Sequence, residues 1–187
     1  MNNFTRTPWM VLALAVITLI GLSGSAFGQA ARPVPIPGVE TAKDVPGAKE
    51  MPDPSLIYKV VFDITKMAPQ VGGVNPSLTG VARYINTLAA HGVSAEHRRI
   101  AVVLHGDAAE IIQENAAFKA RNNGQDNPNI ALIQSMKKAG VDFRVCGQAV
   151  LAKKIEPKNI LPEIELDLWA LTTLTNLELR GYVRVGN

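Results

Sequence analysis

The single cysteine of this chain stands where thiol chemistry would be well placed. Cys146 is the only cysteine among 187 residues, and it ends the apolar run VDFRVC just before a helix-like run that follows Gly147. The start of a helix offers unpaired N–H groups and a partial positive charge, which favour the nucleophilic thiolate. A free cysteine also commonly does no more than pack in a core. The position of Cys146 leaves both interpretations open.

Three further side chains have both a functional and a structural interpretation. His105 ends the apolar run IAVVLHG and is either a base or hydrogen-bond donor near the thiol, or a histidine that satisfies a loop carbonyl. Asp107, with Glu110, is better explained as a helix cap than as a catalytic acid. Trp169 is better explained as a core or interface residue than as a platform for a substrate.

The elements around these residues predict an α/β domain. Apolar, β-branched runs indicate five strands, and helical spacing with Asn-Pro starts and glycine ends indicates helices between them. The expected strands cover 58–64, 100–106, 141–147, 164–169 and 182–185, and the expected helices cover 75–92, 108–121, 127–140, 148–154 and 170–180. Alternating strands and helices favour a mainly parallel five-stranded sheet of flavodoxin-like size. Because ligands of such sheets bind at the carboxyl ends of the strands, Cys146 and His105 fall on the productive edge.

Composition and motifs exclude several classes of function. A net charge of +3 with scattered basic residues gives no support to nucleic-acid binding. The chain lacks Gly-x-Gly-x-x-Gly, Gly-x-x-x-x-Gly-Lys and Gly-x-Ser-x-Gly, so neither a nucleotide cofactor nor a hydrolase elbow is expected. His91, His97 and His105 do not have the spacing of metal ligands, and we therefore expect no metal and no cofactor.

The first residues are expected to direct export. MVLALAVITLIGL (10–22) has the length of a signal-peptide core, and Ala26-Phe27-Gly28 fits a cleavage site, which predicts a signal peptide over 1–28. An uncleaved membrane anchor over 8–28 is the alternative. Export would place the protein in the periplasm or outside the cell, with no stable membrane insertion after cleavage. In such an oxidising compartment a lone thiol is inert, bonded to another molecule, or reactive.

Residues 29–55 hold six of the twelve prolines and few large apolar residues. This composition predicts an extended arm rather than a packed element, either a loose terminus or a segment that wraps a neighbouring subunit. The folded domain is expected to cover 56–187.

Four stretches of the domain resemble a known family. VVLHGDA, NPN, AGVDFRVCGQAV and LTTLTNLELRGYVRV are similar to the DsrE/DsrF-like sulfur-relay proteins, and most closely to the secreted branch of that family, over about 57–187. The resemblance implies a flavodoxin-like three-layer sandwich that assembles as a trimer or hexamer. It also implies a persulfide on the cysteine after the third strand, here Cys146. His105, Gly147, Gln148 and Asn129 are the matching candidates for substrate binding.

Two hypotheses follow. In the first, Cys146 carries sulfur, as a persulfide or another thiol adduct, between a donor and an acceptor that are proteins or small sulfur species. In the second, the chain is a non-catalytic homo-oligomeric binding or assembly module, and Cys146 only lines a pocket. The export signal and the lack of a second cysteine depart from the cytoplasmic relay proteins. The first hypothesis depends on a sulfur atom that solvent can reach.

Overall fold

The computed structural model describes residue 1 and residues 34–68 and 73–186. The chain divides into two units, Met1–Ala30 and Ala31–Asn187. Apart from Met1, the expected signal peptide lies outside the described residues. Within the described residues, no helix is long and apolar enough to cross a membrane.

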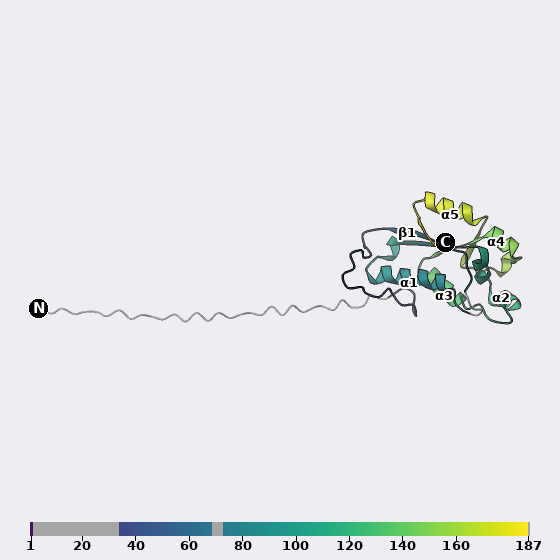
Figure 1. The fold of residues 1–187 in the computed structure, drawn as a ribbon, viewed down its shortest axis with the longest axis horizontal. Helices are drawn as coiled ribbons and strands as arrows, with labels where there is room; N and C mark the ends of the chain where they lie inside the picture. Colours follow the sequence, from purple (N-terminus) through teal and green to yellow (C-terminus); the bar gives the residue numbers. More distant parts are fainter. Residues whose placement is uncertain (2–33, 69–72, 187) are drawn as a thin grey trace. The chain divides into compact units, whose positions relative to one another are not determined.

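The second unit is an α/β domain with one five-stranded sheet, as the sequence predicts (Figure 1). Every strand pair is parallel, and the strand order is β4-β3-β2-β1-β5. The strands are β1 (Tyr58–Ile64), β2 (Arg98–Leu104), β3 (Asp142–Cys146), β4 (Ile164–Asp167) and β5 (Val183–Val185). The α-helices are α1 (Pro76–Ala90), α2 (Asn115–Arg121), α3 (Ile130–Lys138), α4 (Gly147–Ala152) and α5 (Ala170–Leu179), and the 3₁₀ turns are η1 (Ala95–His97), η2 (Gly106–Ile112) and η3 (Pro157–Asn159).

The strand order explains why the two faces of the sheet are covered unequally. From β1 to β4 the chain always adds its next strand on the same side, and right-handed crossovers then put the connecting helices on one face. The step from β4 to β5 returns across the whole sheet, so its helix, α5, lies on the other face. In Figure 1 α5 lies on one side of the sheet, with α1 and α3 on the opposite side.

Two cores result, one on each face. Among the described residues, the larger core holds 23 buried side chains packed on β1, β2 and β3, including Leu78 and Val81 of α1 and Ile133 of α3. The smaller core holds seven, and three of them belong to α5. The seven residues are Val61, Ala101, Val103, Cys146, Ala170, Leu174 and Leu177.

Part of the Pro-rich arm, residues 34–42, is packed on the domain, which corrects the prediction of an unpacked tether for this part, whereas residues 43–55 are mostly exposed. Ile36 is fully buried in the larger core. The side chain of Asn86, also fully buried, accepts from the Ile36 N–H at 3.0 Å and donates to the carbonyls of Ile36 and Val39. Farther along, Thr87 accepts from the N–H of Ala42. We call residues 34–42 the strap. Asn86 and Thr87 of α1 hold it by hydrogen bonds, and the composition of the arm contains no information about these distant partners.

The helix expected over 108–121 is divided in two, η2 and α2. Between them, Gln113 is extended, almost fully buried, and forms an isolated antiparallel bridge with Ile160. Asp107 caps no helix, contrary to the expectation, and forms an ion pair with Lys153 at 3.1 Å.

Candidate functional site

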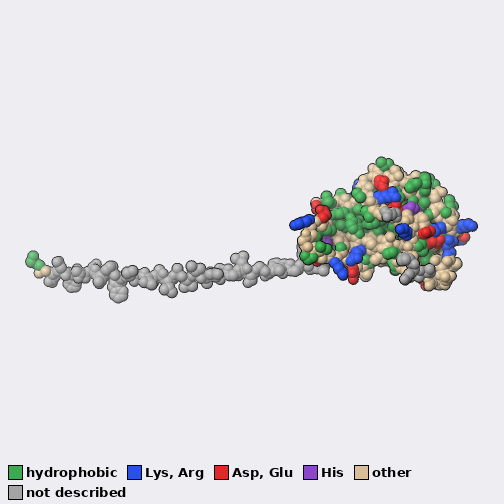
Figure 2. All heavy atoms as spheres, in the orientation of Figure 1, with side chains coloured by type: hydrophobic (Ala, Val, Ile, Leu, Met, Phe, Trp, Pro, Cys, Tyr) green, Lys and Arg blue, Asp and Glu red, His purple; other side chains and the backbone are tan. Residues whose placement is uncertain are grey.

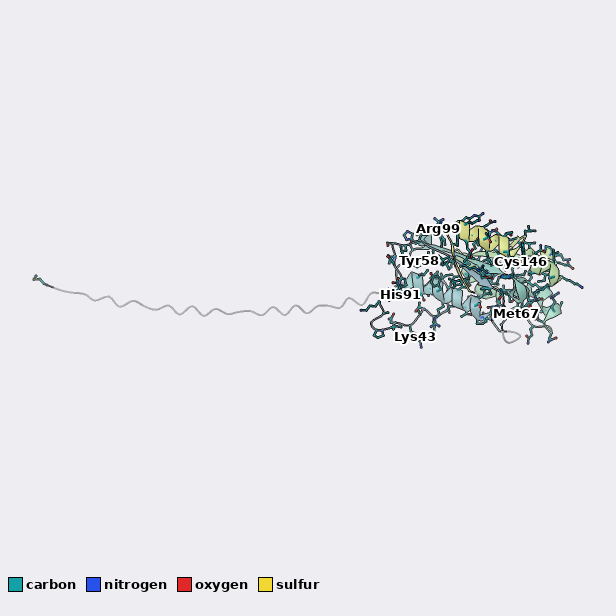
Figure 3. All side chains as sticks on the ribbon, turned by 45° about the horizontal axis from the view of Figure 1, so that its top comes forward. Lys43, Tyr58, Met67, His91, Arg99 and Cys146 are labelled. Carbon is teal, nitrogen blue, oxygen red and sulfur yellow. The ribbon has the colours of Figure 1, made fainter. Side chains whose placement is uncertain are left out.

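Cys146 lies under α5, in the interior of the domain (Figure 3). Its exposed fraction is 4%, and its neighbours in the smaller core are aliphatic. The expectation of a solvent-exposed sulfur is therefore wrong. The sequence predicts correctly that Cys146 ends β3. The crossover from β4 to β5, however, places α5 over the sulfur, and the strand order that causes this could not be derived from the sequence.

The sulfur nevertheless has a polar neighbour. The backbone N–H of Ala170, the first residue of α5, donates to Sγ of Cys146 at 3.2 Å. This N–H is one of those that a helix leaves unpaired at its start, where the helix dipole is positive. The sequence predicts this role for the helix that follows Cys146, whereas in the structure the N–H belongs to α5, which starts 24 residues later.

The first turn of α5 is fastened to the sheet by a carboxylate. Asp167, the register partner of Cys146 on β4, accepts from the Thr173 hydroxyl at 2.7 Å and from Nη1 of Arg144 at 3.3 Å. Arg144 also pairs with Asp142 and Glu165. Burial alone disfavours the charged guanidinium, but the hydrogen bond and charge of Asp142, with Asp167 and Glu165, outweigh it and raise the pKa of Arg144. The Thr173–Asp167 hydrogen bond thus anchors α5 where it covers the sulfur.

His105 shares the face and the edge of Cys146 but is turned toward another residue. The last register pair of β2 and β3 is Leu104 with Val145, so His105 lies one residue beyond it, level with Cys146. Its Nε2 forms a 2.6 Å hydrogen bond with Oδ1 of Asp63 on β1. The Asp63 side chain is almost fully buried, and its other oxygen accepts from the guanidinium of Arg184. Among the described residues, no hydrogen bond joins His105 to Cys146.

The other three candidates hold the local structure together. A Cβ on Gly147 would lie 2.7 Å from the carbonyl oxygen of Asp167, so the glycine permits close approach of the chain after β4 rather than freeing the sulfur. Gln148 is exposed and donates to the carbonyl of Leu168 at 3.3 Å. Asn129 is buried on the loop before α3, where it accepts from the N–H of Asn75 and donates to Asn127.

An apolar pocket opens beside the cysteine. Its volume is about 330 Å³, and its walls include Leu151, Leu166, Leu168 and the two residues that follow Cys146. The three leucines are exposed, as are Trp169 and Leu171 at the start of α5. In the space-filling view, hydrophobic side chains reach the surface over α4 and α5 (Figure 2). The chain segment that hides the sulfur is thus itself apolar and uncovered.

Sequence reasoning missed the residues that shape this site. Ala170, Thr173, Asp63 and Arg184 carry no motif, and their contacts with the strand ends span 6 to 121 positions. The one available signal is Asp63, a charged residue that stands between apolar neighbours in the second half of the run YKVVFDI. The described residues contain no cluster of three or more histidine, cysteine or acidic side chains that could hold a metal ion.

Comparison with known proteins identifies relatives of this domain. A family model described as the DsrE/DsrF-like family matches residues 59–184. A solved structure of a protein of unknown function from Methanobacterium thermoautotrophicum, MTH1491, superimposes with a TM-score of 0.50 at 16% sequence identity. The match covers 68% of this chain and 97% of the other, and at this identity it shows the fold. No curated protein matches the sequence.

Proposed function

Because the chain belongs to the DsrE/DsrF-like family, we propose that it is a sulfur carrier that holds a sulfur atom or thiol adduct on Cys146 in a sheltered position. The observation that carries the proposal is the hydrogen bond from the Ala170 N–H to Sγ, at the positive end of a ten-residue helix. An N–H donor at a helix start stabilises negative charge on the sulfur it contacts, which is the thiolate that accepts the incoming sulfur atom.

Because Cys146 is buried, sulfur transfer requires a local opening of the structure that covers it. The carrier hypothesis requires a sulfur that solvent can reach, and with an exposed fraction of 4% Cys146 meets this requirement only when its cover opens. The cover is the turn at Leu168 and Trp169 with the first turn of α5, and Thr173 and Asp167 fasten it. A closed cover would shield a persulfide from oxidants and from thiol exchange, which the lone cysteine of an exported protein would otherwise meet.

The transfer itself needs no cofactor. The Cys146 thiolate attacks a terminal sulfur of a polysulfide, an S–S bond breaks, and a polysulfide shorter by one sulfur leaves with the electron pair. Release to an acceptor thiolate is the same exchange in reverse. The donor and acceptor are therefore small sulfur species or proteins with an accessible thiol. No nucleic acid takes part.

Intact mass spectrometry tests the proposal. The purified protein is incubated with sodium polysulfide, desalted and weighed without reductant, beside the variant Cys146→Ser. We expect the mass of one added sulfur in the wild type and none in the variant. A wild-type mass that never changes, in a protein whose thiol reacts normally once urea unfolds it, would contradict the carrier function.

The second candidate is the homo-oligomeric assembly module, favoured by the exposed leucines at 151, 166 and 168 and by Trp169. A contiguous apolar surface of this kind marks an interaction site. Light scattering of the purified protein distinguishes the outcomes. A trimer or hexamer would support assembly, whereas a monomer across the micromolar range would remove it.

Export to the periplasm or the medium is part of the proposal and rests on the apolar run at 10–22 and the small residues around 26–28. N-terminal sequencing of the protein from its native cell is the test. We expect the mature chain to begin at Gln29, and a chain that retains Met1 in the cytoplasm would refute export.

A further inference from the structure

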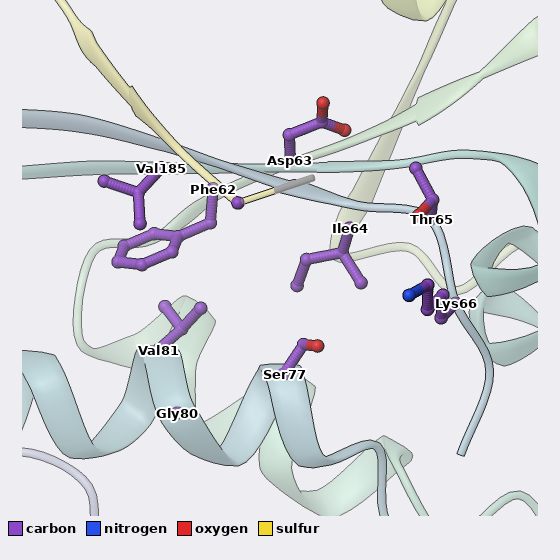
Figure 4. A pocket seen from close by; sticks show the side chains of 10 residues that line it. Phe62, Asp63, Ile64, Thr65, Lys66, Ser77, Gly80, Val81 and Val185 are labelled. Atoms are coloured by element: carbon purple, nitrogen blue, oxygen red, sulfur yellow. The ribbon is translucent and has the colours of Figure 1, made fainter. Parts of the chain in front are cut away.

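A second pocket lies on the face of the sheet opposite Cys146, between the start of α1 and the carboxyl ends of β1 and β5. Its volume is about 440 Å³, which is within the range of small-molecule sites. Apolar side chains form one part of the wall, and Lys66 and Ser77 stand at one end (Figure 4). The apolar wall consists of Phe62, Ile64, Val81 and Val185.

The pocket lies at a position in the sheet where α/β proteins commonly bind ligands. The sheet grows in one direction from β1 to β4, and only β5 is added on the other side of β1. The boundary between β1 and β5 is therefore where the direction of growth reverses, and ligands bind at the carboxyl ends of strands at such a point.

A glycine inside α1 keeps the pocket open. Gly80 is the fifth residue of a 15-residue helix and lines the pocket. A Cβ built on it would meet no atom within 4 Å, so no steric contact requires glycine there. Glycine in a helix interior is less stable than alanine. Glycine at position 80 thus lowers the stability of α1 and leaves empty space in the pocket that a side chain would fill. We take this as an indication that a ligand occupies that space.

The polar groups at the end of the pocket are the ammonium group of Lys66 and the hydroxyl group of Ser77. The carboxylate of Asp63 points away from the pocket, on the other side of β1 (Figure 4), where Arg184 and His105 bind it. Lys66 forms no ion pair within the described residues, and the Ser77 hydroxyl has no hydrogen-bond partner there. The site therefore combines an apolar body with one uncompensated positive charge.

We propose that this pocket binds a small amphiphilic monoanion, a medium-chain carboxylate, with its chain against Phe62, Val81 and Val185 and its carboxylate beside Lys66 and Ser77. The site is separate from Cys146, because the two lie on opposite faces of the sheet. It is a binding function that does not depend on sulfur transfer.

Calorimetric titration with octanoate tests the proposal, with octanol as the uncharged comparison. We expect saturable binding of octanoate to the wild type, weakened at least ~10-fold by Gly80→Leu, which fills the pocket. Lys66→Gln is expected to weaken octanoate by about fivefold and to leave octanol unchanged. The matched control is Thr79→Leu, the exposed neighbour of Gly80 that does not line the pocket, and it should bind as the wild type does.

The design separates loss of the site from loss of the fold. Gly80→Leu adds a helix former in open space, so its melting temperature should equal or exceed that of the wild type. Cys146→Ser should bind octanoate normally, whatever the fate of the sulfur-carrier function. The proposal is overturned if the wild type shows no saturable binding, if Gly80→Leu binds as well as the wild type, or if Thr79→Leu loses binding equally.

Discussion

The N–H of Ala170 points at the sulfur of Cys146 from 3.2 Å, although 24 positions separate the two residues. This contact joins the end of β3 to the start of α5 and makes the thiol part of a helix N-terminus. Because three residues of α5 pack in the same small core as the sulfur, the exposure of Cys146 depends on the position of α5.

Thr173→Val should make Cys146 more reactive. The substitution keeps the shape of the side chain and removes the 2.7 Å hydrogen bond to Asp167 that fastens the first turn of α5. A hydrogen bond to a charged group contributes about 1.5 kcal/mol, so opening and the rate of iodoacetamide labelling should rise ~10-fold. Thr172→Val is the control, because within the described residues the Thr172 hydroxyl donates to the Trp169 carbonyl and makes no hydrogen bond to the sheet. Equal rates in both variants would show that this hydrogen bond does not govern access.

Gly147→Ala should disturb the chain after β4. The new Cβ would lie 2.7 Å from the Asp167 oxygen and 3.2 Å from that of Leu168, both backbone atoms. We expect a loss of about 2 kcal/mol in the free energy of unfolding, measured in urea. Gly124→Ala tests glycine replacement in an exposed turn, where only the positive φ of 76° opposes it. A variant at 147 as stable as the wild type would contradict the close approach.

Asp63→Asn should destabilise the fold. The carboxylate is almost fully buried and binds His105 and Arg184, which stay partly exposed and recover some hydration when their partner is neutral. We expect a loss of about 2 kcal/mol, below the range for fully buried pairs. The exposed pair of Lys119 and Asp126 provides the control, since Asp126→Asn should cost less than about 0.5 kcal/mol. Equal effects of the two substitutions would show that the Asp63 cluster is not a stabilising element.

Asn86→Ala should release the strap. The substitution leaves three backbone groups of Ile36 and Val39 without their partner, at a cost of about 2 kcal/mol. Limited proteolysis should then cleave within residues 34–42 at least ~5-fold faster than in the wild type, if cleavage follows local opening. Asn122→Ala, on the surface after α2, should leave that rate unchanged. A strap that stays protected in the Asn86 variant would show that Ile36 alone holds it.

Local patterns predicted the elements well, because the residues that form them are neighbours in sequence. The run at 58–64 is β1, and Asn75-Pro76 starts α1 with the asparagine as its cap. The failures involve distant partners. Gln113 interrupts a helical pattern because it forms a β-bridge with Ile160. Ile36 lies in the core because the side chain of Asn86 hydrogen-bonds its backbone.

The site shows the same division. The sequence placed Cys146 and His105 correctly at the carboxyl ends of adjacent strands. It could not show that α5 covers the thiol, because this depends on the position of β5 beyond β1. Nor could it show that His105 turns to Asp63, since that choice depends on a cluster completed by Arg184 from the last strand.

The uneven cover of the sheet has a dynamic consequence. One face is secured by 23 buried residues and the other by seven, with a single ten-residue helix as its outer layer. Amide hydrogen exchange should therefore detect a subglobal unfolding unit of low free energy made of α5 and β5, while β1 to β3 keep the protection of the global transition. The sulfur of Cys146 lies at the boundary of that unit, so a modification of the sulfur should change the exchange rates of the amides in residues 170–186.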